Sequence, residues 1–325
     1  MRHSAQMGAN MEREIQMEQL LGQWNLAGRR VKQIYRTAWE VGDSHIVKAY
    51  QDREQMIRSN AVQEALFSLA LPVAKIIPIC GGEKFAAHEG IYFVCQEKLP
   101  SSPGTDIRDA AVARQMGKAI GQLHAGLEKC GKEIPFWNNS LLGELKGWIG
   151  RKLQEDEWRL VGRQEYEENV AELEQFWPKL PGGVIHRDVH LGNFLFKDGK
   201  FTGYVDFDLV QKNIRLFDLC YFLSGLLVKR GDSENALSEA NSSDASSPDG
   251  NLPLSKQEWF GIMEEVIGGY EEVSLLSALE KKAAFCVMEG IELLMTAYYI
   301  GIGQRGDAKE AKRIYDSIRE WKLER

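Results

Sequence analysis

The sequence predicts an α+β protein built in two parts. Its 325 residues are enough for roughly two domains or one large two-lobed unit. Short runs with strand-like patterning are concentrated before residue 98, and longer runs with helical spacing dominate the rest of the chain. A shift to Pro- and Ser-rich sequence after residue 97 gives the predicted boundary, with one part over 1–97 and the other over 98–325.

The composition is that of an ordinary soluble globular protein, with 44% hydrophobic and 27% charged residues. No run approaches the length of a membrane span, so we expect no membrane partner. The chain begins without the apolar core of a signal peptide. Its five cysteines are scattered and form no C-x-x-C, which argues against a zinc site or a disulfide framework. We therefore expect a cytoplasmic protein with reduced thiols.

The charge is unevenly distributed along the chain. The net charge is -7, with +1 over residues 1–98 and -8 over residues 99–325. An acidic second part argues against nucleic acid as a partner. It is compatible with a cationic substrate and equally with an ordinary solvated surface. The sequence indicates no oligomeric state.

In the first part, the patterns predict a small sheet with one helix packed on it. A short amphipathic helix is expected over 12–21. Three strands follow, the last two joined by a Gly-Asp-Ser turn, and then come a helix, an apolar run bounded by prolines and a further strand. Their predicted ranges are 31–34, 38–41, 45–50, 60–71, 73–79 and 90–96.

In the second part, the patterns predict mainly helices. We expect helices over 109–129, 259–270, 275–301 and 307–323, two helices within 148–177, and one that begins at Arg215. His124 falls on the apolar face of the first of these, and we interpret it as a hydrogen-bonded core residue. Residues 231–253 contain almost no apolar side chain, which predicts a flexible insertion.

The chemistry is concentrated in residues 184–206. An apolar run leads into a polar loop that contains His186, Asp188 and Asn193. A hairpin follows, with Asp198-Gly199 as its turn signal, and its second strand ends next to Asp206. The hairpin brings the two aspartates and the asparagine together. One carboxylate can then accept a proton, while an amide oxygen and the other carboxylate can hold a hard divalent cation. This is the equipment of metal-assisted phosphoryl transfer.

The pattern H-x-D-x-x-x-x-N with an Asp after the next strand resembles the kinase-like small-molecule phosphotransferases. Arg187 gives an H-R-D as in protein kinases, where aminoglycoside phosphotransferases usually have H-G-D. The segment 205–208, Val-Asp-Phe-Asp, departs from D-F-G and is similar to that of the aminoglycoside phosphotransferase and choline kinase group. That superfamily includes type II homoserine kinases and spore-coat-associated kinases.

The resemblance implies a protein-kinase-like fold, with a small β-rich N-lobe and a larger, mostly helical C-lobe. It implies ATP and Mg²⁺ as cofactors. Asp188 and His186 would be catalytic, with Asp188 orienting or deprotonating the acceptor hydroxyl. Asn193 and Asp206 would hold the Mg²⁺. Asp218 would support the catalytic loop by accepting its backbone N–H groups.

The resemblance also implies a nucleotide site in the first part of the chain. Lys48 lies in a predicted strand and Glu64 in the helix that follows, which matches the lysine that contacts phosphates and its glutamate partner. The connector that contains Glu97 and Leu99 would bind the adenine through its backbone. The first strand pair has no G-x-G-x-x-G, so the loop near residues 35–37 would have to cover the phosphates.

The acceptor is expected to be a small molecule. Asp218 follows Asp206 by only twelve residues, and no Ala-Pro-Glu is present, so little chain remains for the activation segment of a protein kinase. The family implies an aminoglycoside, an amino alcohol, homoserine or a sugar. The alternatives are a non-catalytic kinase-like scaffold or spore-coat-associated protein, and a protein kinase.

Overall fold

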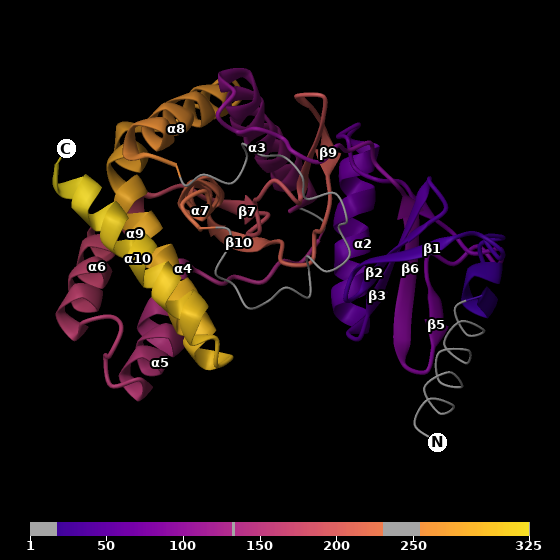
Figure 1. Ribbon diagram of the computed structural model, residues 1–325, viewed down its shortest axis with the longest axis horizontal. Helices are drawn as coiled ribbons and strands as arrows, with labels where there is room; N and C mark the ends of the chain where they lie inside the picture. Colours follow the sequence, from indigo (N-terminus) through magenta and orange to yellow (C-terminus); the bar gives the residue numbers. More distant parts are fainter. Residues whose placement is uncertain (1–17, 132–133, 230–253, 325) are drawn as a thin grey trace. The chain divides into compact units, whose positions relative to one another are not determined.

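The computed structural model describes residues 18–131, 134–229 and 254–324. The described residues up to Pro100 form one compact unit, and those from Ser101 onward form a second. Antiparallel strands dominate the first unit and helices the second (Figure 1), which confirms the predicted α+β class. The predicted insertion over 231–253 lies outside the described residues.

The first unit is built on a six-stranded antiparallel sheet with the order β1-β2-β3-β6-β4, in which β5 also pairs with β6. The predictions for the first three strands and for β6 are confirmed to within a residue or two. The apolar run over 73–79 forms only the short β4, and β5 was not predicted. The bounds are β1 Val31–Tyr35, β2 Ala38–Val41, β3 His45–Tyr50, β4 Ile76–Ile77, β5 Ala86–His88 and β6 Ile91–Glu97.

Both faces of this sheet are covered by apolar side chains. Val47 of β3 packs with Trp24 from the segment that precedes the sheet. Tyr50 packs on the other face with Met56 of the helix α2. Successive side chains of a strand point to opposite faces, so Lys48 shares the face of Tyr50, and its Nζ lies 5.0 Å from the centre of the Tyr50 ring.

Helix α2 spans Arg53–Ser68 and begins seven residues before the predicted start at Asn60. The polar residues of its first two turns suggested a loop. The decisive signal is Asp52, whose side chain accepts hydrogen bonds from the backbone N–H groups of Glu54 and Gln55 at 2.8 and 3.2 Å. Such an N-cap satisfies N–H groups that have no partner inside the helix, so the helix starts there.

The second unit contains most of the helices. The region predicted as two helices over 148–177 contains α5 and α6, and α5 is the end of a longer helical segment that starts at α4 and passes through a π-helical turn, Leu145–Ile149. A 3₁₀ turn, Trp177–Lys179, follows α6. The bounds are α3 Ala110–Cys130, α4 Leu141–Glu144, α5 Gly150–Glu155, α6 Arg163–Phe176, α7 Leu216–Gly225, α8 Lys256–Glu271, α9 Ala278–Gly301 and α10 Arg305–Leu323.

Helices α3 and α8 pack backbone to backbone, because each has a glycine at the contact. A Cβ on Gly117 would lie 1.8 Å from the carbonyl oxygen of Val266, and one on Gly269 would lie 1.9 Å from that of Arg114. Any larger side chain at either position would separate the helices. This packing holds in place α3 and its buried His124.

Helix α9 is the central helix of this unit and packs against α6, α7 and α10. It is the one described helix that is long and apolar enough to cross a membrane by length and composition, but 78% of its most apolar window is buried inside the protein. Burial among the other helices therefore accounts for its apolar sequence.

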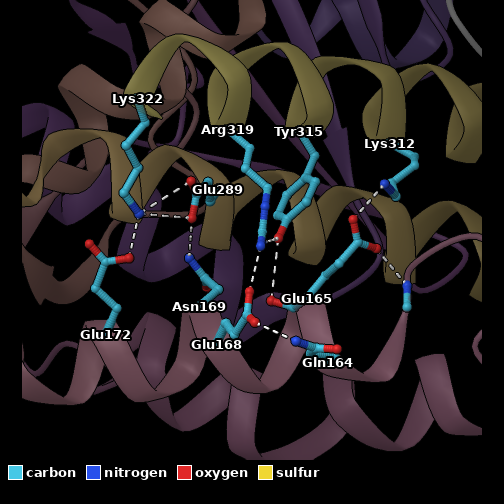
Figure 2. Close-up of polar contacts among 11 residues, drawn as sticks. Gln164, Glu165, Glu168, Asn169, Glu172, Glu289, Lys312, Tyr315, Arg319 and Lys322 are labelled. Atoms are coloured by element: carbon cyan, nitrogen blue, oxygen red, sulfur yellow. Dashed lines mark hydrogen bonds and ion pairs between the residues drawn. The ribbon is translucent and has the colours of Figure 1, made fainter. Parts of the chain in front are cut away.

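One side of α9 is closed by a polar cluster between α6 and α10, which we call the α6–α10 cluster (Figure 2). Glu289 of α9 is 2% exposed. Lys322 of α10 lies 3.3 Å from Glu289 and also pairs with Glu172 of α6. Asn169 donates to Glu289 at 3.1 Å. The other labelled members of the cluster are Gln164, Glu165, Glu168, Lys312, Tyr315 and Arg319.

Two short antiparallel pairs lie beside the helices. Strand β7, Gly182–Ile185, pairs with β10, Gln211–Ile214, and β8, Phe194–Lys197, pairs with β9, Lys200–Tyr204. The predicted β8–β9 hairpin is confirmed, and Asp198 and Gly199 of its turn have φ of 51° and 72°, as this two-residue turn requires. Strand β10 was not predicted.

Candidate active site

The loop after β7 is held by a buried carboxylate. Asp218, in the first turn of α7, is fully buried. Its two oxygens accept hydrogen bonds from the backbone N–H groups of His186 and Arg187, both at 2.8 Å. The Nε2 atom of His124 is 2.9 Å from the same carboxylate, and the Nδ1 atom is 3.0 Å from the Tyr270 hydroxyl. His124 is thus a hydrogen-bonded core residue, as predicted.

Arg187 lies in a strained part of this loop. Its φ is 72°, a left-handed conformation that few residues other than glycine adopt. Its backbone bond to Asp218 and its guanidinium contacts hold it there. The guanidinium donates to both oxygens of Glu144 at 2.9 and 3.1 Å and to Gln211 at 2.6 Å. Strain of this kind persists where the surroundings overdetermine it, which is common at functional sites.

His186 is completely buried. Its Nδ1 accepts a hydrogen bond from the Asp188 backbone N–H at 3.3 Å, and its Nε2 is 3.2 Å from the Val205 carbonyl, to which it donates in this tautomer. Burial lowers the pKa of the imidazole and outweighs the nearby carboxylates, so the ring is neutral. These contacts favour a positioning role for His186 over direct contact with a substrate.

Both carboxylate oxygens of Asp188 have hydrogen-bond donors. The Tyr221 hydroxyl is 3.1 Å from Oδ1, and the Asn193 Nδ2 is 3.0 Å from Oδ2. The Nε2 of His190 is 3.5 Å from Oδ2. Burial alone would raise the pKa of Asp188, but its contacts with His190 and Tyr221 lower it below its usual value. Asp188 is therefore ionised near neutral pH and can accept a proton.

The two predicted metal ligands lie on neighbouring strand ends. The Asn193 carbonyl accepts the Val205 backbone N–H at 2.9 Å, which puts Asn193 opposite the residue before Asp206. The Asn193 Nδ2 donates to the backbone and side-chain oxygens of Asp188, so its Oδ1 remains as a possible ligand. Asp206 is exposed and has a φ of 68°. An amide oxygen and a carboxylate are oxygen donors that suit Mg²⁺, which usually takes few protein ligands and keeps waters or phosphates.

A metal site made of protein side chains alone is not present in the part of the chain that the structure describes. No group of three or more His, Cys, Asp or Glu side chains lies there in a metal-binding arrangement. Mg²⁺ is often bound by one or two protein oxygen ligands together with phosphate oxygens of a substrate. Asn193 and Asp206 would form a site of this second kind.

The predicted nucleotide-binding residues lie in the first unit. Lys48 is half-buried in β3, and Glu64 lies in α2 on the same side of the sheet. Glu64 forms an ion pair with Lys84 at 2.5 Å; a pair between Lys48 and Glu64 stays a prediction. Glu97 ends β6, and Leu99 lies two residues further along the chain.

A cavity of about 250 Å³ adjoins the Asp188 loop within the second unit. It is lined by the loop residues 189–192, by Tyr221 and its neighbours on α7, and by residues of α9 and α10. Glu292 of α9 faces it and is 4% exposed. Burial raises the pKa of Glu292 to about 7. Sequence patterns do not identify Tyr221 or Glu292 as site residues, because each lies in a helix whose pattern indicates only a core position.

A family model described as the phosphotransferase enzyme family matches residues 27–241. Among curated proteins, the chain is 33% identical over 140 residues to a homoserine kinase of Phenylobacterium zucineum, covering 41% of this chain and 42% of that protein. It is 32% identical over 125 residues to a homoserine kinase of Chelativorans sp., covering 37% and 38%. The chain thus spans about two fifths of the length of these relatives.

Solved structures of low sequence identity share the fold over nearly the whole chain. An aminoglycoside phosphotransferase from Alicyclobacillus acidocaldarius matches with a TM-score of 0.63 at 14% identity, covering 94% of this chain and 93% of that one. The amicoumacin kinase hAmiN, solved with AMP-PNP, Ca²⁺ and Ami, also matches with a TM-score of 0.63, at 15% identity and with 88% of each chain covered.

Proposed function

We propose that this chain, which belongs to the phosphotransferase enzyme family, transfers the γ-phosphate of ATP to a hydroxyl group of a small molecule. The observation that carries the proposal is the environment of Asp188. It is an ionised carboxylate with a donor on each oxygen, in a loop held by the buried Asp218. Such a group is suited to orient a hydroxyl and to accept its proton.

The remaining roles follow from the positions of the side chains. Tyr221 and Asn193 fix the two Asp188 oxygens, while the buried His186 holds the loop backbone. The Asn193 Oδ1 and the Asp206 carboxylate would hold Mg²⁺. When bound, that ion would neutralise phosphate charge, which is a large part of catalysis in phosphoryl transfer.

Nucleotide binding is assigned to the first unit. Lys48 would contact the phosphates, with Glu64 as its partner, and the backbone from Glu97 to Leu99 would bind the adenine. The family match covers all four residues. The names of the similar proteins include homoserine, aminoglycoside and amicoumacin kinases, and all of these act on small molecules.

The test is a phosphotransfer assay with Mg²⁺ and ATP on a panel of hydroxylated metabolites, comparing the parent protein with Asp188→Asn. We expect the variant to lose about 10²- to 10⁴-fold in kcat, the usual contribution of an acid–base group, and to keep its affinity for ATP. Asp316→Asn is the matched control, because the Asp316 side chain is 55% exposed and, among the described residues, forms an ion pair with Lys312 alone. An Asp188 variant with activity within about tenfold of the parent would contradict the assignment.

A further inference from the structure

We propose that the cavity beside Asp188 is the acceptor subsite and that it selects a compact amino alcohol, with the ammonium group at Glu292 and the hydroxyl at Asp188. This inference rests on the proposed function and narrows it. Tyr221 connects the cavity to the catalytic carboxylate, because its side chain lines the cavity and its hydroxyl donates a hydrogen bond to Asp188. The loop residues 189–192 complete the wall on the same side.

The charge of the cavity indicates a cationic ligand. Glu292 lines it and is 4% exposed. The Ser224 hydroxyl and the Arg313 guanidinium lie near enough to lower the pKa of Glu292 in part, but burial outweighs both. The Arg313 guanidinium is instead bound to Glu310 at 2.7 and 2.8 Å. A buried carboxylate without a bonded counter-ion is costly, and a ligand ammonium would supply that counter-ion.

The same lining argues against an acceptor that bears a carboxylate. Its acidic residues are Glu292, Asp307 and Glu310, and none of the described residues that form the wall is a lysine or arginine. Glu310 is paired with Arg313, but the carboxylate of an amino acid such as homoserine would still lie near Glu292 and Asp307 with no lysine or arginine in the described wall, and such juxtaposition is unfavourable. We therefore do not infer homoserine, the acceptor in the names of the curated relatives, as the acceptor of this chain.

The size of the cavity limits the acceptor further. Its volume of about 250 Å³ is below the roughly 300–1,000 Å³ of typical small-molecule pockets. A short chain or a single ring fits within this space, whereas a multi-ring aminoglycoside would extend beyond it. The apolar part of the wall includes Phe222, Met295 and Ile314, which suits the methylene groups that join an amine to a hydroxyl.

The first experiment compares acceptors on the unmodified protein by measuring ADP release with Mg²⁺ and ATP. The panel pairs ethanolamine and propanolamine with the neutral diols of the same length, and adds homoserine and a multi-ring aminoglycoside. We expect kcat/KM for the better amino alcohol to exceed those of its diol and of homoserine at least about tenfold, since a charge-assisted hydrogen bond typically changes affinity by that factor or more. A preference for homoserine, the diol or the aminoglycoside, or no turnover of either amino alcohol, overturns the inference.

The second experiment uses Glu292→Gln. We expect KM for the amino alcohol to rise at least about tenfold, clearly more than KM for the diol, which has no charge to pair with Glu292. Glu289→Gln is the matched control, because Glu289 is a buried glutamate of the same helix that contacts Lys322 and Asn169. An equal loss for amine and diol would indicate a structural role and overturn the assignment.

The two proposals fail in different ways. If phosphate is transferred only to homoserine or to a neutral sugar, and this transfer requires Asp188, the phosphotransferase function stands and the amino alcohol subsite is wrong. If no acceptor is phosphorylated and no Asp188-dependent ATP hydrolysis occurs, the proposed function itself is wrong.

Discussion

At the scale of single residues, the main feature of the site is that each oxygen of Asp188 has its own donor. One of these donors, the Tyr221 hydroxyl, comes from α7 at 3.1 Å. We predict that Tyr221→Phe lowers kcat about tenfold, a typical loss for one hydrogen bond to a charged group, and leaves KM for ATP unchanged. Steady-state kinetics with the acceptor at saturation would measure this.

The pH profile separates positioning by Tyr221 from simple packing. The Tyr221 hydrogen bond is one of the contacts that lower the pKa of Asp188. Its removal raises that pKa, so the acidic limb of the kcat/KM profile should move to higher pH in Tyr221→Phe. A variant with reduced kcat but an unmoved acidic limb would indicate that Tyr221 only fills space.

Glu292 gives a prediction about stability. Burial raises its pKa from 4.5 to about 7, so the folded state binds more protons than the unfolded state between these values. Its contribution to stability is therefore present at low pH and is lost as the pH rises through this range. We predict that Glu292→Gln is more stable than the parent at pH 8, by up to about 3 kcal/mol, and nearly equal to it at pH 5.

Urea unfolding at the two pH values would test this prediction. The relevant groups around Glu292 are Ser224 of α7 and Glu310 and Arg313 of α10; all three remain in the variant, so the difference reports on Glu292 alone. A variant that is less stable at pH 8 than the parent would show that the Glu292 carboxylate has a partner that compensates its burial.

How far the site could be predicted from sequence depends on how local its residues are. Asp188, Asn193 and Asp206 lie within one hairpin and its preceding loop, so their spacing alone places them together. Tyr221 and Glu292 lie in helices far along the chain. Helical spacing marks such residues as core positions, and only the packing of α7 against α9 brings them to the cavity.

At the scale of elements, the α6–α10 cluster connects three helices through one buried charge. Lys322 lies 3.3 Å from Glu289 and also pairs with Glu172 (Figure 2). We predict that Lys322→Met destabilises the protein by about 2–4 kcal/mol at pH 8, because removal of one partner leaves a buried charge uncompensated. Denaturant unfolding followed by circular dichroism would measure the loss.

The double variant Lys322→Met/Glu289→Gln is the control, because it removes the buried charge together with its partner. We expect it to recover most of the lost stability. The loss in Lys322→Met should also be smaller at pH 5, since burial raises the pKa of Glu289 and a larger fraction is then neutral. A single variant within about 0.5 kcal/mol of the parent, as for an exposed pair, would contradict this account.

The prediction of elements from sequence failed where the signal is a single residue or a distant partner. Strands β2 and β3 were predicted correctly because a turn and alternating side chains define them locally. The start of α2 was missed because it depends on the cap residue Asp52. Strand β10 was missed because pairing with β7 is what makes it a strand.

At the scale of the whole molecule, metal and nucleotide should stabilise the protein together. A ligand that binds only the folded state raises stability by about 2.7 kcal/mol at 100 times its Kd. We predict that ATP with Mg²⁺ raises the melting temperature, and that removal of Mg²⁺ with EDTA abolishes most of the increase. In Asp206→Asn, the rise in melting temperature caused by ATP with Mg²⁺ should be as small as the rise that ATP causes in the parent protein in the presence of EDTA.

Thermal unfolding at fixed ATP, with and without EDTA, would measure these shifts in both proteins. Asp316→Asn again serves as a matched exposed control. Equal losses in Asp206→Asn with and without Mg²⁺ would show that Asp206 acts on the nucleotide and not through a metal.

The apolar helix α9 has a consequence for biosynthesis. Its partner α10 follows it along the chain, so α9 leaves the ribosome first. Until α10 arrives, the face that it covers has no partner, and exposed apolar surface of this kind promotes aggregation and the binding of chaperones. The step at which the nascent chain is most vulnerable therefore comes between the synthesis of α9 and that of α10, when the catalytic loop and α7 have already been made.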